Sequence, residues 1–503
     1  MPRHDVAALT DIPENKPFKG TAGDIDVLLI RRGVQVTALT HDCPHYGLPL
    51  SEGVVHGDTI ICPFHHACFS TRTGEQMQPP GHGNLKRYET AVEDGRVWVT
   101  LNDDEDGAPA TRDHVTKDPD DARHFVIAGT GAAGMACAFA LREEGFTGQI
   151  TMIAPGAALP INRTGLSKEV IAGEGDVEVL ADKESLSTRD VAVIDGEVVA
   201  TSERHATLAD GTTVDFDALL LAPGGIARKP DLAGVDLPGV HRLRSAEDAQ
   251  AIADAAGSAK SAILVGGGFI GMEGALSLAK RGLDVTVILR EEVPLASVLG
   301  DLIGRAVMAE HEAEGVTFRT GVALDHVTGD GKATGVALDD GSECAADLVI
   351  LALGMTPATD RIGGIPSDDD GGITVEGDLS VPGRPGLFAA GDVARTPTAF
   401  GPARIEHWRV ALQHGRRAAL SMLGKAASGT DVPFFWTALK RQYRYVGHAE
   451  GWDEIIFDGD PAKGPFLARF VKGGKTVAAV GAGRDADLAS LHLDMAAAGG
   501  PIP

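Results

Sequence analysis

The first hundred residues alternate apolar and polar positions over several short runs. The clearest runs are residues 25–39, 54–61 and 96–101, and glycines and prolines interrupt them at short intervals. Alternation with a period of two is typical of half-buried β-strands, and turn residues between the runs favour hairpins. The pattern therefore predicts a small all-β domain at this end of the chain.

Two later stretches run from an apolar strand through a glycine-rich turn into a helix and then a second strand. They cover residues 124–154 and 261–289, and each carries Gly-x-Gly-x-x-Gly at the turn. In such a βαβ unit the first glycine permits the turn, the second admits a pyrophosphate and the third lets helix and strand pack. Two units predict two bound nucleotides. The glycines are Gly129, Gly131 and Gly134 in the first unit and Gly266, Gly268 and Gly271 in the second.

Length and charge narrow the class of protein. The 503 residues exceed the roughly 250–300 at which a single core stops growing, so we expect several domains. The net charge of −26 disfavours nucleic acid and anionic membranes as partners. Solubility alone is a sufficient reason for such a charge, and a basic protein partner would also suit it.

Cysteine use and hydropathy indicate a cytoplasmic protein. Five cysteines are too few for a disulfide framework, and an odd number leaves one without a partner, which favours a reducing compartment. The first sixteen residues contain no apolar segment typical of a signal peptide. Residues 262–279 are apolar, but their glycines fit a buried strand–turn–helix better than a membrane span. We therefore expect no membrane span.

Two short loops each contain one cysteine and one histidine: Cys43 with His45, and Cys62 with His65. Such a set fits a tetrahedral zinc site, or a [2Fe–2S] cluster with two cysteines on one iron and two histidines on the other. Zinc fingers usually pair cysteine with cysteine along the chain, whereas here each loop can supply a ligand to each iron. The spacing favours the iron–sulfur cluster, and zinc or a merely structural cluster remains the alternative.

With Gly47 and Pro49, the two loops resemble the Rieske family over about residues 5–105. The resemblance implies that Cys43, His45, Cys62 and His65 are the metal ligands. High-potential members link their loops by a disulfide, but the first loop here has Leu48 at that place, so the resemblance is to the ferredoxin-like group.

Two residues of the second loop depart from the family pattern, and a third cysteine follows them. The family often has tryptophan where this chain has Phe64, and glycine where it has His66. His66 is expected either to hinder close approach of backbone to the cluster or to add a titratable group beside it. Cys68 is expected to be an unpaired, packed thiol.

The order of three nucleotide motifs resembles that of the flavoproteins with two dinucleotide-binding domains. Besides the two βαβ units, residues 386–393 form an apolar strand that ends in Gly391-Asp392. The resemblance covers about residues 123–428 and implies FAD binding, an inserted NAD(P)-binding domain and a return to the FAD site. Cys137 and Cys344 are far apart and no Cys-x-x-Cys pair follows residue 68, which disfavours a disulfide reductase.

Residues 159–168, LPINRTGLSK, resemble the motif of the ferredoxin-reductase and apoptosis-inducing-factor-like branch. Arg163, Leu166, Ser167 and Lys168 match its pattern, whereas Ile161, Asn162 and Thr164 do not. This branch pairs the lysine with a helix glutamate beside the flavin, which is Glu273 here, and places Trp408 near the isoalloxazine. The implied catalytic residues are Lys168, Glu273 and Trp408, with an ordinary ion pair as the alternative for the first two.

The resemblance also implies the nucleotide contacts. For FAD they are Gly129, Gly131, Ala132, Ala133, Gly134, Arg163, Lys168, Gly391 and Asp392. For NAD(P)H they are Gly266, Gly268, Phe269, Ile270, Gly271, Arg290 and Gly354. The acid that normally holds the ribose is replaced by Gly156 in the first unit and Leu289 in the second. Arg290 could instead pair with the 2′-phosphate of NADPH, and the choice between NADH and NADPH stays open.

Taken together, the chain resembles the apoptosis-inducing factor-like, Rieske-fused oxidoreductases almost from end to end. The expected fold is multidomain: an all-β Rieske domain, two Rossmann-like three-layer α/β domains and a C-terminal α+β domain. The expected bounds are 1–105 for the Rieske domain, 106–122 for an acidic linker, 123–243 and 368–428 for the FAD-binding domain, 244–367 for the NAD(P)-binding domain and 429–503 for the C-terminal reductase domain.

The implied function is NAD(P)H-dependent electron transfer through FAD and the fused [2Fe–2S] cluster to an outside acceptor, such as an oxygenase or a cytochrome P450. The linker would let the small domain swing between flavin and partner. The C-terminal domain would pack on the flavoprotein body, in a monomer or a homodimer. Two alternatives remain: an NAD(P)H oxidase that uses oxygen, and a redox sensor with slow turnover.

Overall fold

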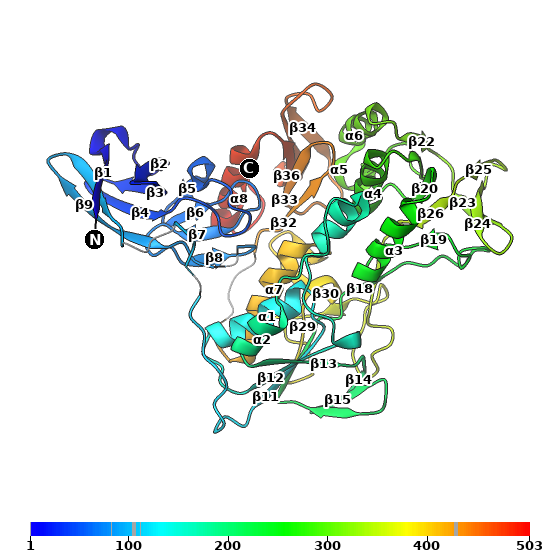
Figure 1. The fold of residues 1–503 in the computed structure, drawn as a ribbon, viewed down its shortest axis with the longest axis horizontal. Helices are drawn as coiled ribbons and strands as arrows, with labels where there is room; N and C mark the ends of the chain where they lie inside the picture. The colour runs from blue at the N-terminus through cyan, green and yellow to red at the C-terminus, as the bar shows by residue number, and fades with distance from the viewer. Residues whose placement is uncertain (1, 82, 103–106, 111, 427–430) are drawn as a thin grey trace.

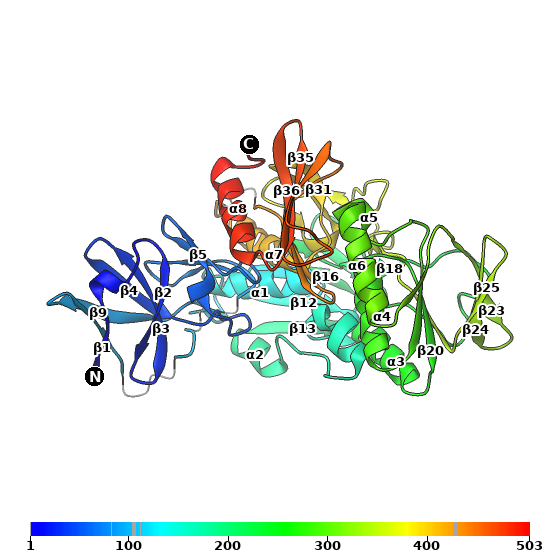
Figure 2. The ribbon, with the colours of Figure 1, turned by 90° about the horizontal axis from the view of Figure 1, so that it is seen from above.

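The computed structural model describes residues 2–503 except 82, 103–106, 111 and 427–430. The predicted limits at residues 105, 106, 428 and 429 therefore lie outside the described residues. The N-terminal β domain lies at one end of the molecule, beside the C-terminal helix, and the two nucleotide-binding units lie beyond it (Figure 1). From above, the N-terminal domain and the sheet β23–β25 lie at opposite ends (Figure 2).

The N-terminal domain contains a six-stranded antiparallel sheet in the order β1-β10-β9-β4-β3-β2 and a four-stranded sheet β5-β6-β7-β8. In β3, Val27 and Leu29 face one core, while Leu28 and Ile30 face a second core that includes Cys43 and other residues of the ligand loops. Alternation along one strand thus holds the ligand loops against a sheet. The strands are β1 Arg3–Ala8, β2 Pro17–Ala22, β3 Ile25–Arg32, β4 Gln35–Thr40, β5 Val54–His56, β6 Thr59–Ile61, β7 Cys68–Ser70, β8 Gln76–Gln78, β9 Arg87–Glu93 and β10 Arg96–Thr100.

The first nucleotide-binding unit is built on a parallel sheet in the order β13-β12-β11-β17-β29. Helices α1 and α7 pack against each other in the same core as this sheet and the small sheet β14-β15-β16. The elements are β11 His124–Ala128, α1 Ala132–Glu143, β12 Gln149–Ala154, α2 Lys183–Thr188, β13 Val191–Asp195, β14 Val198–Thr201, β15 His205–Leu208, β16 Thr213–Asp215, β17 Ala218–Leu221, β28 Ile373–Thr374, β29 Leu387–Ala389, β30 Ala394–Thr398, β31 Gly401–Arg404 and α7 Trp408–Met422.

The second unit repeats this plan with the parallel sheet β19-β26-β20-β21-β22. In β20, Ala262 and Leu264 face the helices, whereas Ile263 and Val265 face the small sheet β23-β24-β25. The three predicted layers therefore follow from side-chain alternation. The elements are β19 Val240–His241, α3 Ala246–Ala256, β20 Ser261–Val265, α4 Phe269–Lys280, β21 Asp284–Ile288, α5 Ala296–Leu299, α6 Asp301–Ala313, β22 Thr317–Arg319, β23 Leu324–Gly329, β24 Ala333–Leu338, β25 Glu343–Ala345 and β26 Leu348–Leu351.

The last part of the chain forms an antiparallel sheet in the order β32-β33-β36-β35-β34, followed by a helix. One face of this sheet shares a core with α4 and α6, and the other shares a core with the helix α8. The elements are β32 Phe434–Ala438, β33 Gln442–Gly447, β34 Glu454–Asp458, β35 Phe466–Lys472, β36 Lys475–Ala482 and α8 Asp485–Ala498, and the pair β18 Gly225–Ala227 with β27 Met355–Pro357 joins the two nucleotide-binding units.

The N-terminal domain is docked on this body through specific polar contacts. Gln78 bonds to both Gln413 and Asp431, at 2.9 and 3.0 Å, and Tyr46 accepts a bond from Asn162 at 3.0 Å. The contact also has an apolar part, in which Ile61 and Cys68 of the N-terminal domain pack against Ala489 and Leu493 of α8. Within the described residues, no helix has both the length and the apolar composition needed to cross a membrane.

Candidate active site

The two ligand loops share one backbone hydrogen-bonding pattern. The amide of Gly47 donates to the carbonyl of Cys43, and the amide of His66 donates to that of Cys62, each at 2.9 Å. Gly47 and His66 occupy the matching position, and both have positive φ, at 67° and 57°. Glycine adopts this conformation freely, whereas a side chain there costs roughly 1–2 kcal/mol. His66 therefore sits in a strained position that surrounding contacts must stabilise.

The loops bring like ligands together. The thiols of Cys43 and Cys62 share a hydrogen bond, which raises the pKa of Cys43 and lowers that of Cys62. The rings of His45 and His65 meet edge to face with centroids 4.6 Å apart. Burial lowers the pKa of His65 to about 3, so its imidazole is neutral, as metal ligation requires. A pair of sulfurs beside a pair of imidazole nitrogens is a donor set that fits a [2Fe–2S] cluster of the Rieske type.

His66 points away from the paired ligands and into the body. Its ring stacks on Phe434 with centroids 3.6 Å apart, and its Nδ1 lies 3.0 Å from Nδ1 of His492. The carbonyl of His66 accepts a bond from Arg409 at 3.0 Å. Cys68 is a buried free thiol, as expected. These contacts hold the strained residue in place.

A cavity of about 740 Å³ lies between the two nucleotide-binding units and the C-terminal sheet. Gly131 and Gly268 line it, and a Cβ at either would meet no protein atom within 4 Å. The open space beside both glycines, each directly before its helix, fits a pyrophosphate at a helix N-terminus. The predicted residues that line the cavity are Gly129, Gly131, Ala132, Ala133, Arg163, Lys168, Gly268, Phe269, Ile270, Gly271, Glu273, Gly354, Gly391, Asp392 and Trp408.

Three predicted nucleotide residues do not line the cavity. A Cβ on Gly134 would lie 2.1 Å from the carbonyl of Gly129, so this glycine lets helix and strand pack. A Cβ on Gly266 would lie 2.3 Å from the carbonyl of Ala352, so it serves strand packing in the same way. Arg290 is exposed, after the end of β21.

Lys168 and Glu273 form an ion pair at the cavity wall, in which the carboxylate is buried and the lysine is partly exposed. Their closest atoms, Nζ and Oε2, are 3.3 Å apart. Ser167 donates to Oε2 of Glu273 at 2.5 Å, and Thr437 donates to its Oε1 at 2.7 Å. Ser167 and Lys168 lie on a single π-helical turn, Leu166–Val170, an uncommon element that is frequent at functional sites. Three donors thus hold the carboxylate of Glu273 in one orientation.

A row of aromatic rings joins the cavity to the ligand loops. Trp436 and His407 both line the cavity, and their ring centroids are 5.0 Å apart. Trp436 also lies 4.7 Å from His65 and 6.1 Å from His45, measured between centroids. His407 directly precedes Trp408, which lines the cavity at the start of α7. Burial lowers the pKa of His407 to about 3, so the row carries no charge of its own at neutral pH.

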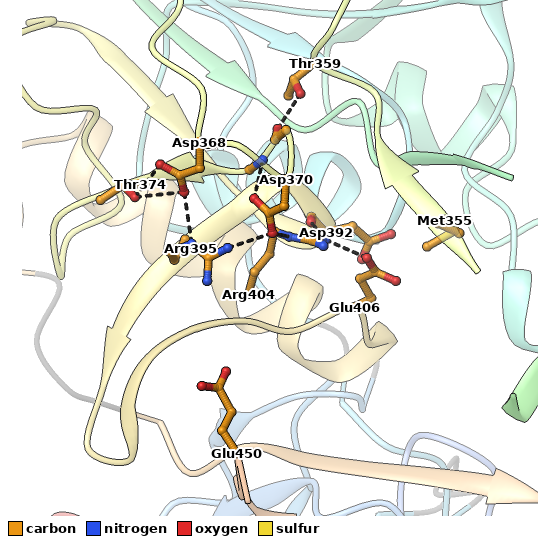
Figure 3. A network of polar contacts seen from close by, with 12 residues as sticks. Met355, Thr359, Asp368, Asp370, Thr374, Asp392, Arg395, Arg404, Glu406 and Glu450 are labelled. Atoms are coloured by element: carbon orange, nitrogen blue, oxygen red, sulfur yellow. Dashed lines mark hydrogen bonds and ion pairs between the residues drawn. The ribbon is translucent and has the colours of Figure 1, made fainter. Parts of the chain in front are cut away.

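The Gly391-Asp392 turn is held by a polar network (Figure 3). Asp392 pairs with Arg244 at 2.7 Å, and its carbonyl accepts a bond from Arg404 at 2.9 Å. Arg404 also pairs with Asp370 and Glu406, and Arg395 joins Asp370 to Asp368. The carboxylate of Asp392 is thereby fixed at the cavity wall.

Several residues that matter here were not among the predicted ones. Trp436 and Thr437 belong to a segment predicted only as part of the C-terminal domain, and His407 precedes a predicted tryptophan. The pair of aromatic residues before Trp436 was the only signal in the sequence, and such runs are also common in cores.

Comparison with known proteins supports both halves of this description. Residues 123–415 match the family of pyridine nucleotide-disulphide oxidoreductases, and residues 3–89 match the Rieske [2Fe-2S] domain. Apoptosis-inducing factor 3 of Homo sapiens is 33% identical over 468 residues, which are 90% of this chain and 77% of that protein. The ferredoxin–NAD(+) reductase subunit of the benzene 1,2-dioxygenase system of Pseudomonas putida is 32% identical over 381 residues, 74% of this chain and 93% of that protein.

A solved structure also supports the reductase half of this description. The reductase fold is similar to that in the covalent putidaredoxin reductase–putidaredoxin complex, with a TM-score of 0.71 and 27% identity over 75% of this chain and 94% of that one. The expected Rieske domain, reductase domains and cofactors are confirmed. The chain thus belongs to the pyridine nucleotide-disulphide oxidoreductase family and carries a Rieske domain, families whose cofactors are FAD, NAD(P)H and a [2Fe–2S] cluster.

Proposed function

We propose that this protein oxidises NAD(P)H at the cavity and passes the electrons through Trp436 to the cluster of its own Rieske domain, and from there to a separate acceptor protein. The observation that carries the proposal is the position of Trp436. It lines the cavity and contacts His65, one of the proposed cluster ligands, at a centroid distance of 4.7 Å.

When bound, FAD would supply the redox chemistry, since it can accept a hydride from NAD(P)H and release electrons singly, as a one-electron cluster requires. The proposed ligands are Cys43 and Cys62 for one iron and His45 and His65 for the other. The protein's remaining task is to place the two cofactors close together, and the docked domain supports that role.

We assign Lys168 and Glu273 to positioning charge at the flavin edge of the cavity. The ammonium of Lys168 offsets the buried carboxylate, and a fixed pair costs little reorganisation when charge changes beside it. Trp408, at the start of α7, is assigned to the cavity wall that would hold the flavin ring system. Arg163 and Asp392 are assigned to FAD, and Gly268 and its helix to NAD(P)H.

The proposed acceptor is a separate protein. Relatives include reductases named for a benzene dioxygenase system and for putidaredoxin. In this chain the fused domain takes the place of a separate ferredoxin, so the acceptor would be the protein that a ferredoxin serves, such as an oxygenase or a cytochrome P450. The net charge of −26 favours a basic docking surface on that partner. The five cysteines form no disulfide, which is compatible with a reducing compartment such as the cytoplasm.

The test is an anaerobic titration with NADH and then NADPH, followed by visible absorbance and EPR. The proposal predicts that the flavin absorbance bleaches and that a Rieske-type EPR signal grows with it. The better reductant also decides the nicotinamide preference and the role of Arg290. Flavin bleaching without any cluster signal, even after dithionite, would contradict the proposal. Steady oxygen consumption without a partner would favour an oxidase instead.

A further inference from the structure

Two arginines of the reductase body reach the second ligand loop of the Rieske domain. Arg444 donates to the carbonyl of Phe64 at 2.6 Å, and Arg409 donates to that of His66 at 3.0 Å. Phe64 and His66 flank the proposed ligand His65. Both cations therefore lie next to the cluster site, although they come from β33 and α7, far along the chain.

The two arginines differ in how their charge is balanced. Arg444 pairs with Asp485 at 2.7 Å, so the two together are close to neutral. Arg409 is 0% exposed, and among the described residues no carboxylate forms an ion pair with it. Asp431, the carboxylate whose charge acts on Arg409, is already paired with Arg417.

The immediate surroundings of Arg409 add no negative charge. Among the residues that the structure describes, its Nη1 finds no hydrogen-bond partner, and the Cys68 thiol beside it has a pKa raised to about 11 by burial, so the thiol is neutral at pH 7. A guanidinium stays protonated in proteins. In the described part of the chain, Arg409 is thus a buried positive charge that no carboxylate pairs with directly, an arrangement that is costly for folding alone and calls for a functional reason.

A positive charge at this place favours electron uptake by the cluster. Reduction adds one electron and no atom, so the reduced cluster is more negative by one charge than the oxidised one. In a low-dielectric interior a nearby cation stabilises the reduced form, and cluster potentials follow the net charge around them. We propose that Arg409 is a tuning residue that raises the reduction potential of the cluster in its own chain while the Rieske domain is docked. This inference rests on the proposed function, because it requires the cluster.

The test is a mediated redox titration of the full-length protein with dithionite, in which the Rieske EPR signal gives the midpoint potential. The matched variants are Arg409→Lys and Arg409→Gln, which can both donate to His66 but differ in charge. Arg409→Gln is expected to lose about tenfold in the equilibrium constant for reduction, ~59 mV for a one-electron couple. Arg409→Lys is expected to keep the wild-type potential.

Arg142 provides a control for the removal of a buried arginine. It is also 0% exposed and bonded to backbone carbonyls, but it lies in α1, and its acceptors include Phe146 and Gly148 of the FAD-binding unit. Arg142→Gln should leave the midpoint potential unchanged. Equal potentials for Arg409→Lys and Arg409→Gln would overturn the inference, as would an equal shift in Arg142→Gln.

Failure to load the cluster, in the variant or in the wild-type protein, has a separate meaning in each case. If Arg409→Gln loads no cluster, Arg409→Met, which fills the same space without charge, replaces it in the comparison with lysine and must show the same fall. Absence of a Rieske signal from the wild-type protein itself would instead defeat the proposed function. A normal signal with unshifted potentials would defeat only the role of Arg409.

Discussion

Trp436 lies against His65 with ring centroids 4.7 Å apart, although the two residues belong to the last and the first domain of the chain. Trp436 also lines the nucleotide cavity, so a single indole contacts both redox sites. This contact exists because β32 lies between the cavity and the docked ligand loops. In the proposed function, this contact makes the chain its own electron-transfer complex.

The first prediction concerns this indole. Trp436→Ala should slow reduction of the cluster by at least ~10-fold, which corresponds to ~1.4 kcal/mol of barrier, because it removes the aromatic contact between cavity and His65. Reduction of the flavin by NADH should keep its wild-type rate. Stopped-flow absorbance and freeze-quench EPR separate the two steps. Trp436→Phe keeps an aromatic ring and should lose less; equal cluster kinetics in all three proteins would contradict the role of Trp436.

The second prediction concerns the ion pair of Lys168 and Glu273 at the cavity wall. Glu273→Gln should slow flavin reduction by roughly 10²-fold, because it leaves Lys168 without its carboxylate next to the reacting ring. The pair of Lys280 and Glu174, which involves the same helix, is exposed and serves as the control. Lys280→Ala should leave the rate unchanged, since exposed pairs contribute about 0–1 kcal/mol. Rapid-mixing absorbance measures both, and a normal rate in Glu273→Gln would refute the assignment.

The third prediction separates ligand from neighbouring cysteine. Cys62→Ser should abolish the Rieske EPR signal and electron delivery to a protein acceptor, because a thiolate ligand is removed. Reduction of ferricyanide by NADH, which needs only the flavin, should persist. Cys68→Ser, in the same loop region but not among the proposed ligands, should keep the signal. If Cys68→Ser lost the cluster and Cys62→Ser kept it, the ligand assignment would be wrong.

The fourth prediction compares Gly131 and Gly134, two glycines of the first Gly-x-Gly-x-x-Gly motif. A Cβ at residue 131 meets no protein atom within 4 Å, so Gly131→Val should change the free energy of unfolding of the FAD-free protein by less than ~0.5 kcal/mol. It should nevertheless weaken FAD binding by at least ~10-fold, because the side chain occupies the place of the pyrophosphate.

Gly134→Ala is the matched change. Its Cβ would lie 2.1 Å from the carbonyl of Gly129, so overpacking should destabilise the FAD-free protein by about 1–3 kcal/mol. Denaturant unfolding and flavin-fluorescence titration measure the two effects. Tight FAD binding by Gly131→Val would count against the placement of the pyrophosphate.

The fifth prediction is a pH dependence. His414 is buried, its pKa is lowered to about 3, and its Nδ1 accepts the amide of Gly391 at 3.3 Å. The unfolded chain takes up a proton near pH 6.5 and the folded one does not. Its stabilising contribution is therefore fully present above pH ~6.5 and falls as the pH drops towards 3.

His414→Gln keeps an acceptor for Gly391 but cannot be protonated. Between pH 6.5 and 5 the wild-type protein should lose about 1.6 kcal/mol more free energy of unfolding than this variant, since each full unit is worth ~1.4 kcal/mol and the unfolded histidine is already half protonated at pH 6.5. Denaturant unfolding at several pH values measures the difference. Parallel pH curves for the two proteins would contradict the neutral, buried state of His414.

The ligand loops and the glycine-rich turns could be predicted from the sequence because residues close together in the chain determine their structure. The Cys-x-His and Cys-x-x-His loops and the Gly-x-Gly-x-x-Gly turns need only neighbours in the chain to form, and the structure places their residues together. Trp436 and Arg409 act across domains, and nothing near them in sequence indicates that they meet a loop of the first domain. His66 was recognised only as a departure from glycine. Its positive φ and its contact with His492 depend on tertiary packing, which a single sequence does not reveal.

The central claim is that electrons reach the cluster within one chain. The direct measurement is a single-turnover reaction with limiting NADH at a series of protein concentrations, with the rate of appearance of the Rieske EPR signal as the readout. Transfer through Trp436 predicts one rate constant that does not change over a hundredfold dilution. A rate that falls in proportion to protein concentration would mean that electrons pass between molecules, and it would contradict this account.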